Sequence, residues 1–238
     1  MKEHTMFRLG KRLSLCASLV RPGARLADIG ADHGYLSIWL AKNGLVSRAI
    51  AADVREGPLQ SARQNIAKYG AEGAVSARLS DGLSAFRPEE ADDVAVAGMG
   101  GELIARIVSQ APWLRTPEKH LILQPMTSAE DLRAFLSREG FALFREEAVT
   151  EDGHTYSAML CWYDPPLAAR QGAEEAFPYA GLVDGGTGAG RAYLLARAAS
   201  LKKRAAGLRM AGRAEEAARA ERLQRELERR AGEKGDAT

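Results

Sequence analysis

The sequence predicts an α/β fold: a Rossmann-like, seven-stranded sheet with an antiparallel last strand, followed by a small C-terminal helical domain. Short apolar segments alternate with segments of helical periodicity from residue 26 to residue 138, which is typical of βαβ units and a parallel sheet. Two apolar segments then follow with only a turn between them, which indicates a hairpin at the edge. From residue 191 onward the chain is rich in Ala, Arg, Leu and Glu, which favours helices.

Turn-forming residues set the bounds of the expected elements. Pro58 suits the first turn of a helix. Pro125 is expected to end a strand, and Ser128 to cap the helix that runs to Arg138. An amphipathic helix that packs on the sheet is expected from Lys11 onward. The expected strands are 26–30, 48–54, 75–79, 93–97, 120–124, 141–149 and 156–162, and the other expected helices are 35–42, 58–69 and 102–109.

The C-terminal segment is expected to form two antiparallel helices rather than one long rod. Leu194, Leu201 and Leu208 are seven residues apart, with Ala198 and Ala205 between them, which predicts a short heptad seam. A Gly-rich stretch precedes this segment. We therefore expect four regions: an α/β domain over 1–164, a linker over 165–190, a basic helical hairpin or coiled coil over 191–232, and a disordered tail over 233–238.

Positive charge is concentrated near the C-terminus. Twelve Lys or Arg and five Glu lie between Arg191 and Arg230, an excess of seven positive charges, whereas the whole chain carries only +2. The remaining residues are therefore net negative by five. Such asymmetry indicates contact with nucleic acid or a membrane surface, or else a solvated helical face.

Other bulk features exclude several classes of protein. Apolar runs are all too short to span a membrane. No membrane partner is expected. Cys16 and Cys161 are far apart and in apolar settings, which favours reduced core thiols and a cytoplasmic protein. The four histidines are scattered, so no metal site is expected. The sequence does not fix the oligomeric state; a monomer is the expectation.

The loop after the first strand carries the most informative pattern. Asp28, Gly30, Asp32 and Gly34 form Asp-x-Gly-x-Asp-x-Gly between an apolar segment and a helical one. Carboxylates stand where a dinucleotide fingerprint has glycines, and they would repel a pyrophosphate. A cationic ligand with ribose hydroxyls and an amino group suits them, and S-adenosylmethionine (SAM) is such a ligand.

Three further loops support a SAM site, because ligands of open α/β sheets bind at the carboxyl ends of strands. Asp53 ends the second strand, where a carboxylate can accept from both ribose hydroxyls, although it could instead cap a helix. Asp81 follows the third strand, near the adenine edge, and a glycine-rich loop follows the fourth, where the methyl acceptor approaches. The predicted cofactor site comprises Asp28, Gly30, Asp32, His33, Gly34, Asp53, Val54, Asp81, Gly82, Gly98, Met99 and Gly100.

Three segments together resemble the bacterial tRNA (adenine-N1)-methyltransferase family that acts at position 22. They are residues 27–36 (ADIGADHGYL), residues 97–101 (AGMGG) and Leu123-Gln124-Pro125. The resemblance covers most of the chain, including the basic tail. It implies a Rossmann-like SAM domain, a small coiled-coil domain and a tRNA substrate bound by the basic helices and the catalytic cleft. Ser37 is a departure, since many relatives are expected to have Pro there.

The loop after the fourth strand bears on which nitrogen is methylated. Methyltransferases that act on exocyclic amines resemble one another in an Asn/Asp-Pro-Pro-aromatic motif there, whereas this chain has Gly98-Met99-Gly100-Gly101. Adenine N1 has an in-plane lone pair and needs alignment with the methyl–sulfur bond, plus an acceptor for the amino proton of the product. Asp32, Gln124 and Tyr35 are the candidates for the acceptor and positioning roles; Asp32 could equally bind the SAM amino group.

Several residue roles and functions stay open. His33 could be a base or a hydrogen-bonded loop residue, Met99 could contact adenine or fill the core, and Arg12 could reach the SAM carboxylate or be exposed. A nicotinamide-dependent dehydrogenase is disfavoured, because no Gly-x-Gly-x-x-Gly is present. Two more functions are compatible with the sequence: a SAM-dependent methyltransferase of another RNA or small molecule, and a non-catalytic RNA-binding protein that retains the fold.

Overall fold

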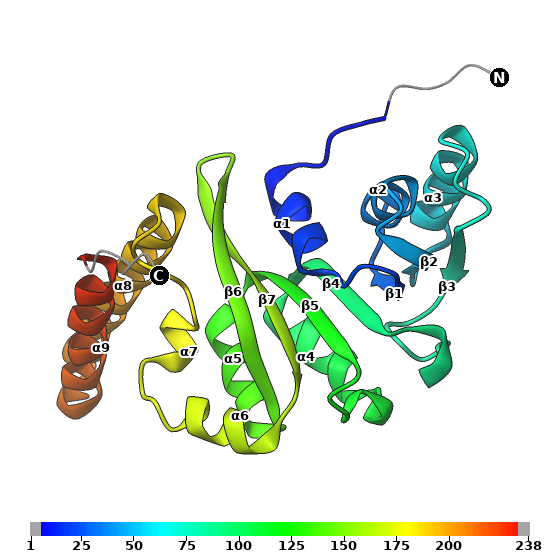
Figure 1. Cartoon of the computed structure of the whole chain (residues 1–238). Helices are drawn as coiled ribbons and strands as arrows, with labels where there is room; N and C mark the ends of the chain where they lie inside the picture. Colours follow the sequence, from blue (N-terminus) through cyan, green and yellow to red (C-terminus); the bar gives the residue numbers. More distant parts are fainter. Residues whose placement is uncertain (1–5, 233–238) are drawn as a thin grey trace.

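A computed structural model describes residues 6–232 and confirms the predicted fold class (Figure 1). Seven strands form one sheet in the order β3-β2-β1-β4-β5-β7-β6. All neighbours are parallel except those of β7, which is antiparallel to both β5 and β6. The strands are β1 (Ala24–Ile29), β2 (Val46–Asp53), β3 (Val75–Leu79), β4 (Asp93–Gly100), β5 (His120–Thr127), β6 (Phe141–Glu151) and β7 (His154–Tyr163).

Helices cover both faces of the sheet (Figure 1). Successive residues of a strand point to opposite faces, so Val94 and Val96 enter one apolar core while Ala95 enters the other. One core takes residues from α1 (Lys11–Leu19), α2 (Tyr35–Lys42) and α3 (Glu56–Lys68). The opposite core takes residues from α4 (Gly101–Ser109) and α5 (Ala129–Arg138). Two short 3₁₀ helices, η1 (Pro88–Glu90) and η2 (Pro112–Leu114), lie in the loops before β4 and β5.

Two expectations at the junction of β5 and α5 were wrong: the end of the strand and the side-chain cap of the helix, although the helix has the expected bounds. Strand β5 continues through Pro125, because Met99 pairs with Pro125 and Gly100 with Thr127 across register shifts, and irregular positions of a sheet tolerate a missing N–H. Ser128 occupies the N-cap position of α5 but has a left-handed backbone (φ 52°) and makes no side-chain cap hydrogen bond. Ser128 bonds the helix through its backbone carbonyl, which accepts the N–H of Leu132.

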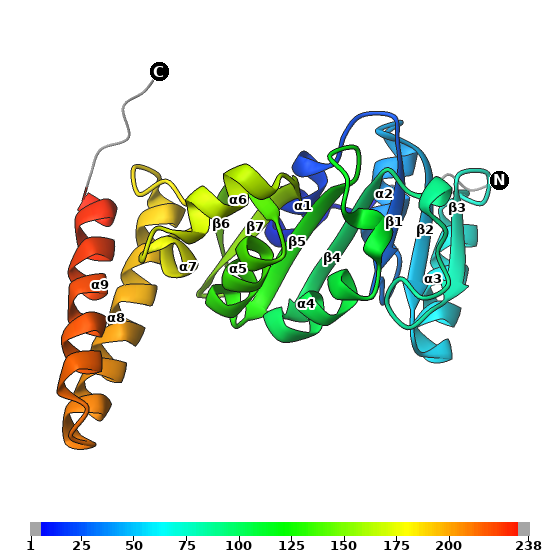
Figure 2. The same cartoon turned by 90° about the horizontal axis from the view of Figure 1, so that it is seen from below.

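The C-terminal helices form the expected hairpin. Helix α8 (Gly188–Met210) and helix α9 (Ala214–Gly232) are joined by a short turn and lie side by side, projecting from the β6 edge (Figure 2). Leu194, Ala198, Leu201 and Ala205 are buried in the seam between them. The predicted linker contains α6 (Pro165–Gly172), α7 (Phe177–Ala180) and the start of α8. The predicted tail over 233–238 lies outside the described residues.

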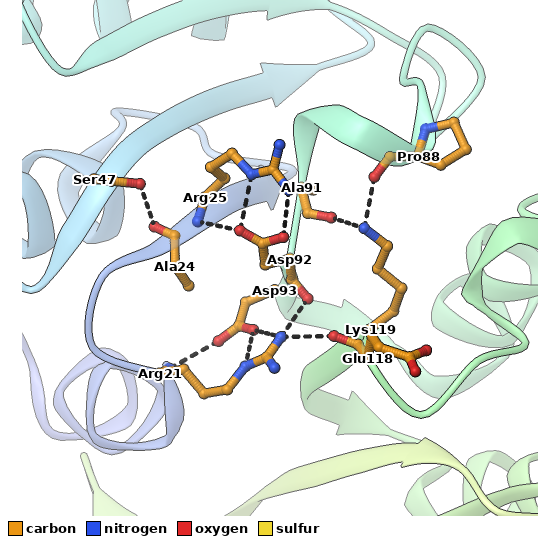
Figure 3. Close-up of polar contacts among 10 residues, drawn as sticks. All are labelled: Arg21, Ala24, Arg25, Ser47, Pro88, Ala91, Asp92, Asp93, Glu118 and Lys119. Atoms are coloured by element: carbon orange, nitrogen blue, oxygen red, sulfur yellow. Dashed lines mark hydrogen bonds and ion pairs between the residues drawn. The ribbon is translucent and has the colours of Figure 1, made fainter.

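Ion pairs hold the amino ends of the central strands (Figure 3). Arg21 bonds the buried carboxylate of Asp93, and Arg25 bonds Asp92 through both its backbone and its guanidinium group. The Arg25 side chain lowers the pKa of Asp92 well below its usual range. Lys119 donates to the carbonyls of Pro88 and Ala91. This network stabilises the amino ends of the strands. The predicted cofactor site lies at the opposite, carboxyl ends.

Candidate functional site

Four adjacent strands bring the predicted cofactor residues to one edge of the sheet. The carboxyl ends of β1, β2, β3 and β4 follow the spatial order 3-2-1-4. The glycine-rich segment that was expected as a loop after the fourth strand is the end of β4 itself, which runs directly into α4. Backbone hydrogen bonds join the ends of β1, β2 and β3: Gly30 and Ala31 donate to the Ala52 carbonyl, and Ser80 donates to the Asp53 carbonyl. The side chain of Met99 lies directly over Gly30, so that a Cβ at Gly30, whose φ is +73°, would overlap its methyl group. The loop after β1 and the glycine-rich end of β4 are therefore in contact.

Asp28 lies beneath the first loop rather than in open space. Its side chain is buried, and Oδ2 accepts a 2.8 Å hydrogen bond from Oγ of Ser37 on α2. Burial raises the pKa of Asp28 to about 6, although the Ser37 hydrogen bond acts in the opposite direction. Asp28 can therefore act on a cofactor by charge from below the loop. The sequence did not indicate that Ser37 bonds Asp28, because the two residues lie on different elements, α2 and β1.

The second and third loops present a carboxylate flanked by exposed apolar side chains. Asp53 is 6% exposed, and its Oδ1 accepts the backbone N–H of Arg55 at 2.9 Å. Arg55 is itself the N-cap residue of α3, which has no side-chain cap hydrogen bond, so the alternative that Asp53 caps a helix is wrong. Val54 and Leu79, at the ends of β2 and β3, are 60% and 54% exposed. Two exposed apolar side chains beside a carboxylate suit an aromatic base attached to a ribose. The sequence analysis did not include Leu79 in the predicted cofactor site, because only its exposure in the folded chain indicates that it can contact a ligand. Asp81 and Gly82 border this region. Nη2 of Arg106 lies 3.9 Å from Oδ1 of Asp81.

The residues between Asp32 and Tyr35 form the exposed rim of the site. The side chain of Asp32 is 62% exposed and lies 3.7 Å from Nε2 of His33. The His33 ring stacks on Tyr35 with 5.3 Å between centroids, and Tyr35 also contacts Phe7 at 4.8 Å. Asp32 and Tyr35 are thus accessible to a ligand, whereas Phe7 is a neighbour that the sequence did not indicate. Gly34, with a φ of +67°, is the N-cap residue of α2.

Gln124 is fully buried and bonds the glycine-rich end of β4. Its Oε1 accepts hydrogen bonds from Nη1 of Arg12 and from the backbone N–H of Gly98, both at 3.1 Å. Its Nε2 donates to the Pro125 carbonyl at 2.8 Å. This geometry favours a positioning role for Gln124, because its polar atoms face the protein.

Arg12 is neither free nor simply exposed. Its Nε lies 2.5 Å from Oε2 of Glu151 at the tip of the β6–β7 hairpin, and its guanidinium group lies over the Tyr156 ring at 5.3 Å. Arg12 thus connects α1, the β6–β7 hairpin and the Gln124 side chain.

A Cβ at Gly101 would overlap the Ser128 carbonyl, so the start of α4 also depends on a close backbone approach.

Sequence similarity to known methyltransferases covers the α/β domain. Residues 9–159 match the model of the family described as "Methyltransferase domain". The tRNA (adenine(22)-N(1))-methyltransferase of Bacillus subtilis (strain 168) is 39% identical over 153 residues, which is 64% of this chain and 64% of that enzyme. Sequence similarity therefore spans somewhat less than two thirds of that relative.

Solved structures extend the similarity to the C-terminal helices. The B. subtilis m1A22 tRNA methyltransferase TrmK superimposes with a TM-score of 0.83 at 30% identity, covering 93% of this chain and 99% of that one. The chain belongs to the TrmK-like tRNA m1A22 methyltransferase family. Another structure of this family, Streptococcus pneumoniae Sp1610 in complex with SAM, has a TM-score of 0.76 at 30% identity and covers 93% and 100%.

Membrane spans and metal clusters are both absent from the described residues. Among the helices of residues 6–232, none combines the length and the apolar character that crossing a bilayer requires. Over the same residues, His, Cys, Asp and Glu side chains do not gather in threes at a spacing that could hold a metal ion.

Proposed function

We propose that this chain transfers a methyl group from SAM to N1 of the adenine at position 22 of tRNA. The contact between the acidic first loop and the glycine-rich end of β4, made by Met99 over Gly30, carries the proposal. This contact supports the proposal because the loop after β1 and the glycine-rich end of β4 lie within one side chain of each other. When bound, SAM supplies a methyl group on a positively charged sulfur, which moves to N1 as the carbon–sulfur bond breaks.

The residues of the chain bind and align the two reactants. Asp53 accepts from the ribose hydroxyls, and Val54 and Leu79 border the adenine of the cofactor. Gly98, whose backbone N–H is bonded by Gln124, and Gly100 let a flat base approach the methyl group in line. Alignment of this kind removes several kcal/mol of barrier. Asp32 is the exposed carboxylate at the rim. It either accepts a proton from the amino group of the methylated adenine or binds the SAM amino group.

The α8–α9 hairpin is the proposed tRNA contact. Seven of its twelve Lys and Arg are engaged in ion pairs or, for Arg204, a hydrogen bond to the Tyr179 hydroxyl. The other five are exposed and make no ion pair with described residues: Arg191, Lys202, Lys203, Arg222 and Arg225. Phosphates are bound by such cations with salt-dependent affinity. The target adenine must leave its stack to reach the cofactor site.

We also propose that this activity takes place in the cytoplasm.

Mass spectrometry of modified nucleosides tests the reaction. The protein is incubated with SAM and an unmodified transcript tRNA, the RNA is digested, and methylated positions are mapped. The expected product is N1-methyladenosine at position 22, with no methylation of a transcript that carries guanine there. Methylation of another atom or another position, or none on any tRNA, contradicts the proposal.

A further inference from the structure

A fully buried ion pair lies between the methyltransferase domain and the α8–α9 hairpin. Arg133 on α5 and Glu146 on β6 both have 0% exposed side chains, and Nη2 of Arg133 lies 2.6 Å from Oε1 of Glu146. Neither residue lines the cofactor site described above. A buried charge pair of this kind needs a reason, since apolar residues of similar volume often give equal or greater stability.

The pair is the centre of a hydrogen-bond network that joins the two parts of the molecule. Arg133 donates to the Tyr193 hydroxyl on α8 at 2.6 Å and to the Pro178 carbonyl on α7 at 2.7 Å. Glu146 Oε2 accepts the backbone N–H of Leu182 at 3.0 Å. Gly181 makes this approach possible, because a Cβ there would overlap the Glu146 carboxylate. The network therefore fixes α7 and α8 to the sheet by directional bonds.

Apolar packing at this junction comes from α7, whose Phe177 is buried in the core that also takes α4 and α5, whereas at α8 itself it contributes little. The apolar core of the hairpin is built from residues of the segment 176–183 and of α8 and α9, and within the described part of the chain the sheet adds to it only a partly buried Ala148. A further polar contact between α8 and α5 is the long Arg197–Glu130 pair at 3.9 Å. Apolar contacts are not directional, so the angle of the hairpin depends chiefly on the Arg133 network.

The base of the hairpin also adjoins the acceptor side of the site. A small cavity of about 30 Å³ between β5, β7 and α8 is lined by Met126, Thr127, Ser157, Tyr193 and Arg197, among others. Thr127 pairs with Gly100 at the glycine-rich end of β4, and Ser157 and Tyr193 both bond Arg133. A change in the angle of α8 is thus a change in the position of bound RNA relative to the glycine-rich end of β4.

We propose that Arg133 is a positioning residue: with Glu146 and Tyr193 it holds the hairpin at the angle that delivers the tRNA adenine to the glycine-rich end of β4. The proposal rests on the proposed function, because it assumes that the hairpin binds the substrate RNA. The guanidinium group suits this role, since its planar set of donors fixes several acceptors at once.

The test combines a distance measurement with kinetics on the full chain. Spin labels are placed on Gln64→Cys in α3 and on Met210→Cys, which is 91% exposed at the end of α8. Burial raises the pKa of the native Cys16 thiol to about 12 and that of Cys161 further, so both native thiols are poorly reactive. The test variants are Arg133→Met combined with Glu146→Leu, which leaves no unpaired charge, and Tyr193→Phe, which removes one hydroxyl. Tyr179→Phe is the matched control, because its hydroxyl bonds Arg204 and not Arg133.

In the double variant we expect a broader distance distribution, an unchanged Kd for SAM, and a kcat on tRNA reduced by about ten- to a hundredfold. Tyr193→Phe should shift both quantities in the same direction by a smaller factor, and it decides the matter if the double variant does not fold. A distribution as narrow as that of the parent, or a broad one with unchanged kcat, overturns the proposal. If the parent chain methylates no tRNA, the proposed function fails, while the distance distribution still reports on the junction.

Discussion

Ser37 donates a 2.8 Å hydrogen bond to Oδ2 of Asp28, and both side chains are buried beneath the loop between β1 and α2. The bond crosses from the strand to the helix that it precedes, so it ties the two sides of the cofactor loop together. Burial nevertheless raises the pKa of Asp28 to about 6. The charge below the cofactor loop therefore changes within an accessible pH range.

SAM affinity should increase as the pH rises from 5 to 7, with a midpoint near the pKa of Asp28. Below that pKa the carboxyl group is neutral and does not attract the sulfonium, whereas above it the carboxylate does. Isothermal titration calorimetry at several pH values measures this dependence. Asp28→Asn should have weaker affinity and little dependence on pH over the range. An equal pH dependence in this variant would show that another group is responsible.

Asp28→Asn should also increase the stability of the unliganded protein at pH 7. The pKa of Asp28 is higher in the folded protein (about 6) than its ordinary value of 3.8, so its contribution to stability is present below pH 4 and is lost as pH rises through 6. The difference corresponds to about 3 kcal/mol at pH 7. Urea unfolding of both proteins at pH 4 and pH 7 measures it, and the stabilisation by Asn should appear only at the higher pH.

Asp53→Ala should weaken SAM binding by roughly tenfold or more, because the two ribose hydroxyls lose a charged acceptor. Calorimetry at pH 7 measures the loss. Asp152→Ala, in the turn between β6 and β7, is the control and should bind SAM as the parent does. Unchanged affinity in both Asp53→Ala and Asp28→Ala would count against the whole cofactor site.

Arg222→Ala combined with Arg225→Ala should weaken tRNA binding and leave SAM binding intact. Removing one cation that binds a phosphate should make the plot of log K against log salt shallower by about 0.7 to 0.9. Arg213→Ala combined with Arg219→Ala removes the same charge from the same part of the chain, but these residues pair with Glu216 and Glu175. The control should therefore have the smaller effect on the slope. Equal slopes for the two variants would mean that the hairpin acts through net charge alone.

The sequence predicts the sheet and the positions of its loops well, because both depend on local patterns. Alternation of apolar and helical segments is visible in the sequence, and the acidic glycine loop marks the carboxyl end of β1. Strand ends are less predictable: β4 and β5 extend past Gly98 and Pro125 because they pair with each other, and this pairing is not a local property.

Contacts between distant parts of the chain could not be predicted in the same way. Gln124 has the residue type of a ligand-binding side chain, but the structure occupies its oxygen with Arg12, which is 112 positions away. Arg133 belongs to an ordinary amphipathic helix in sequence, and only the folded chain shows that its partners are Glu146 and Tyr193. Buried polar networks of this kind depend on several elements meeting at one point.

The apolar core of the hairpin is nearly closed on itself, with Ala148 as its neighbour from the sheet among the residues that the structure describes. The length and the surface charge of the hairpin can therefore change during evolution without repacking the core of the α/β domain. The tRNA contact that we propose for the hairpin can therefore diversify while the methyl-transfer site stays the same.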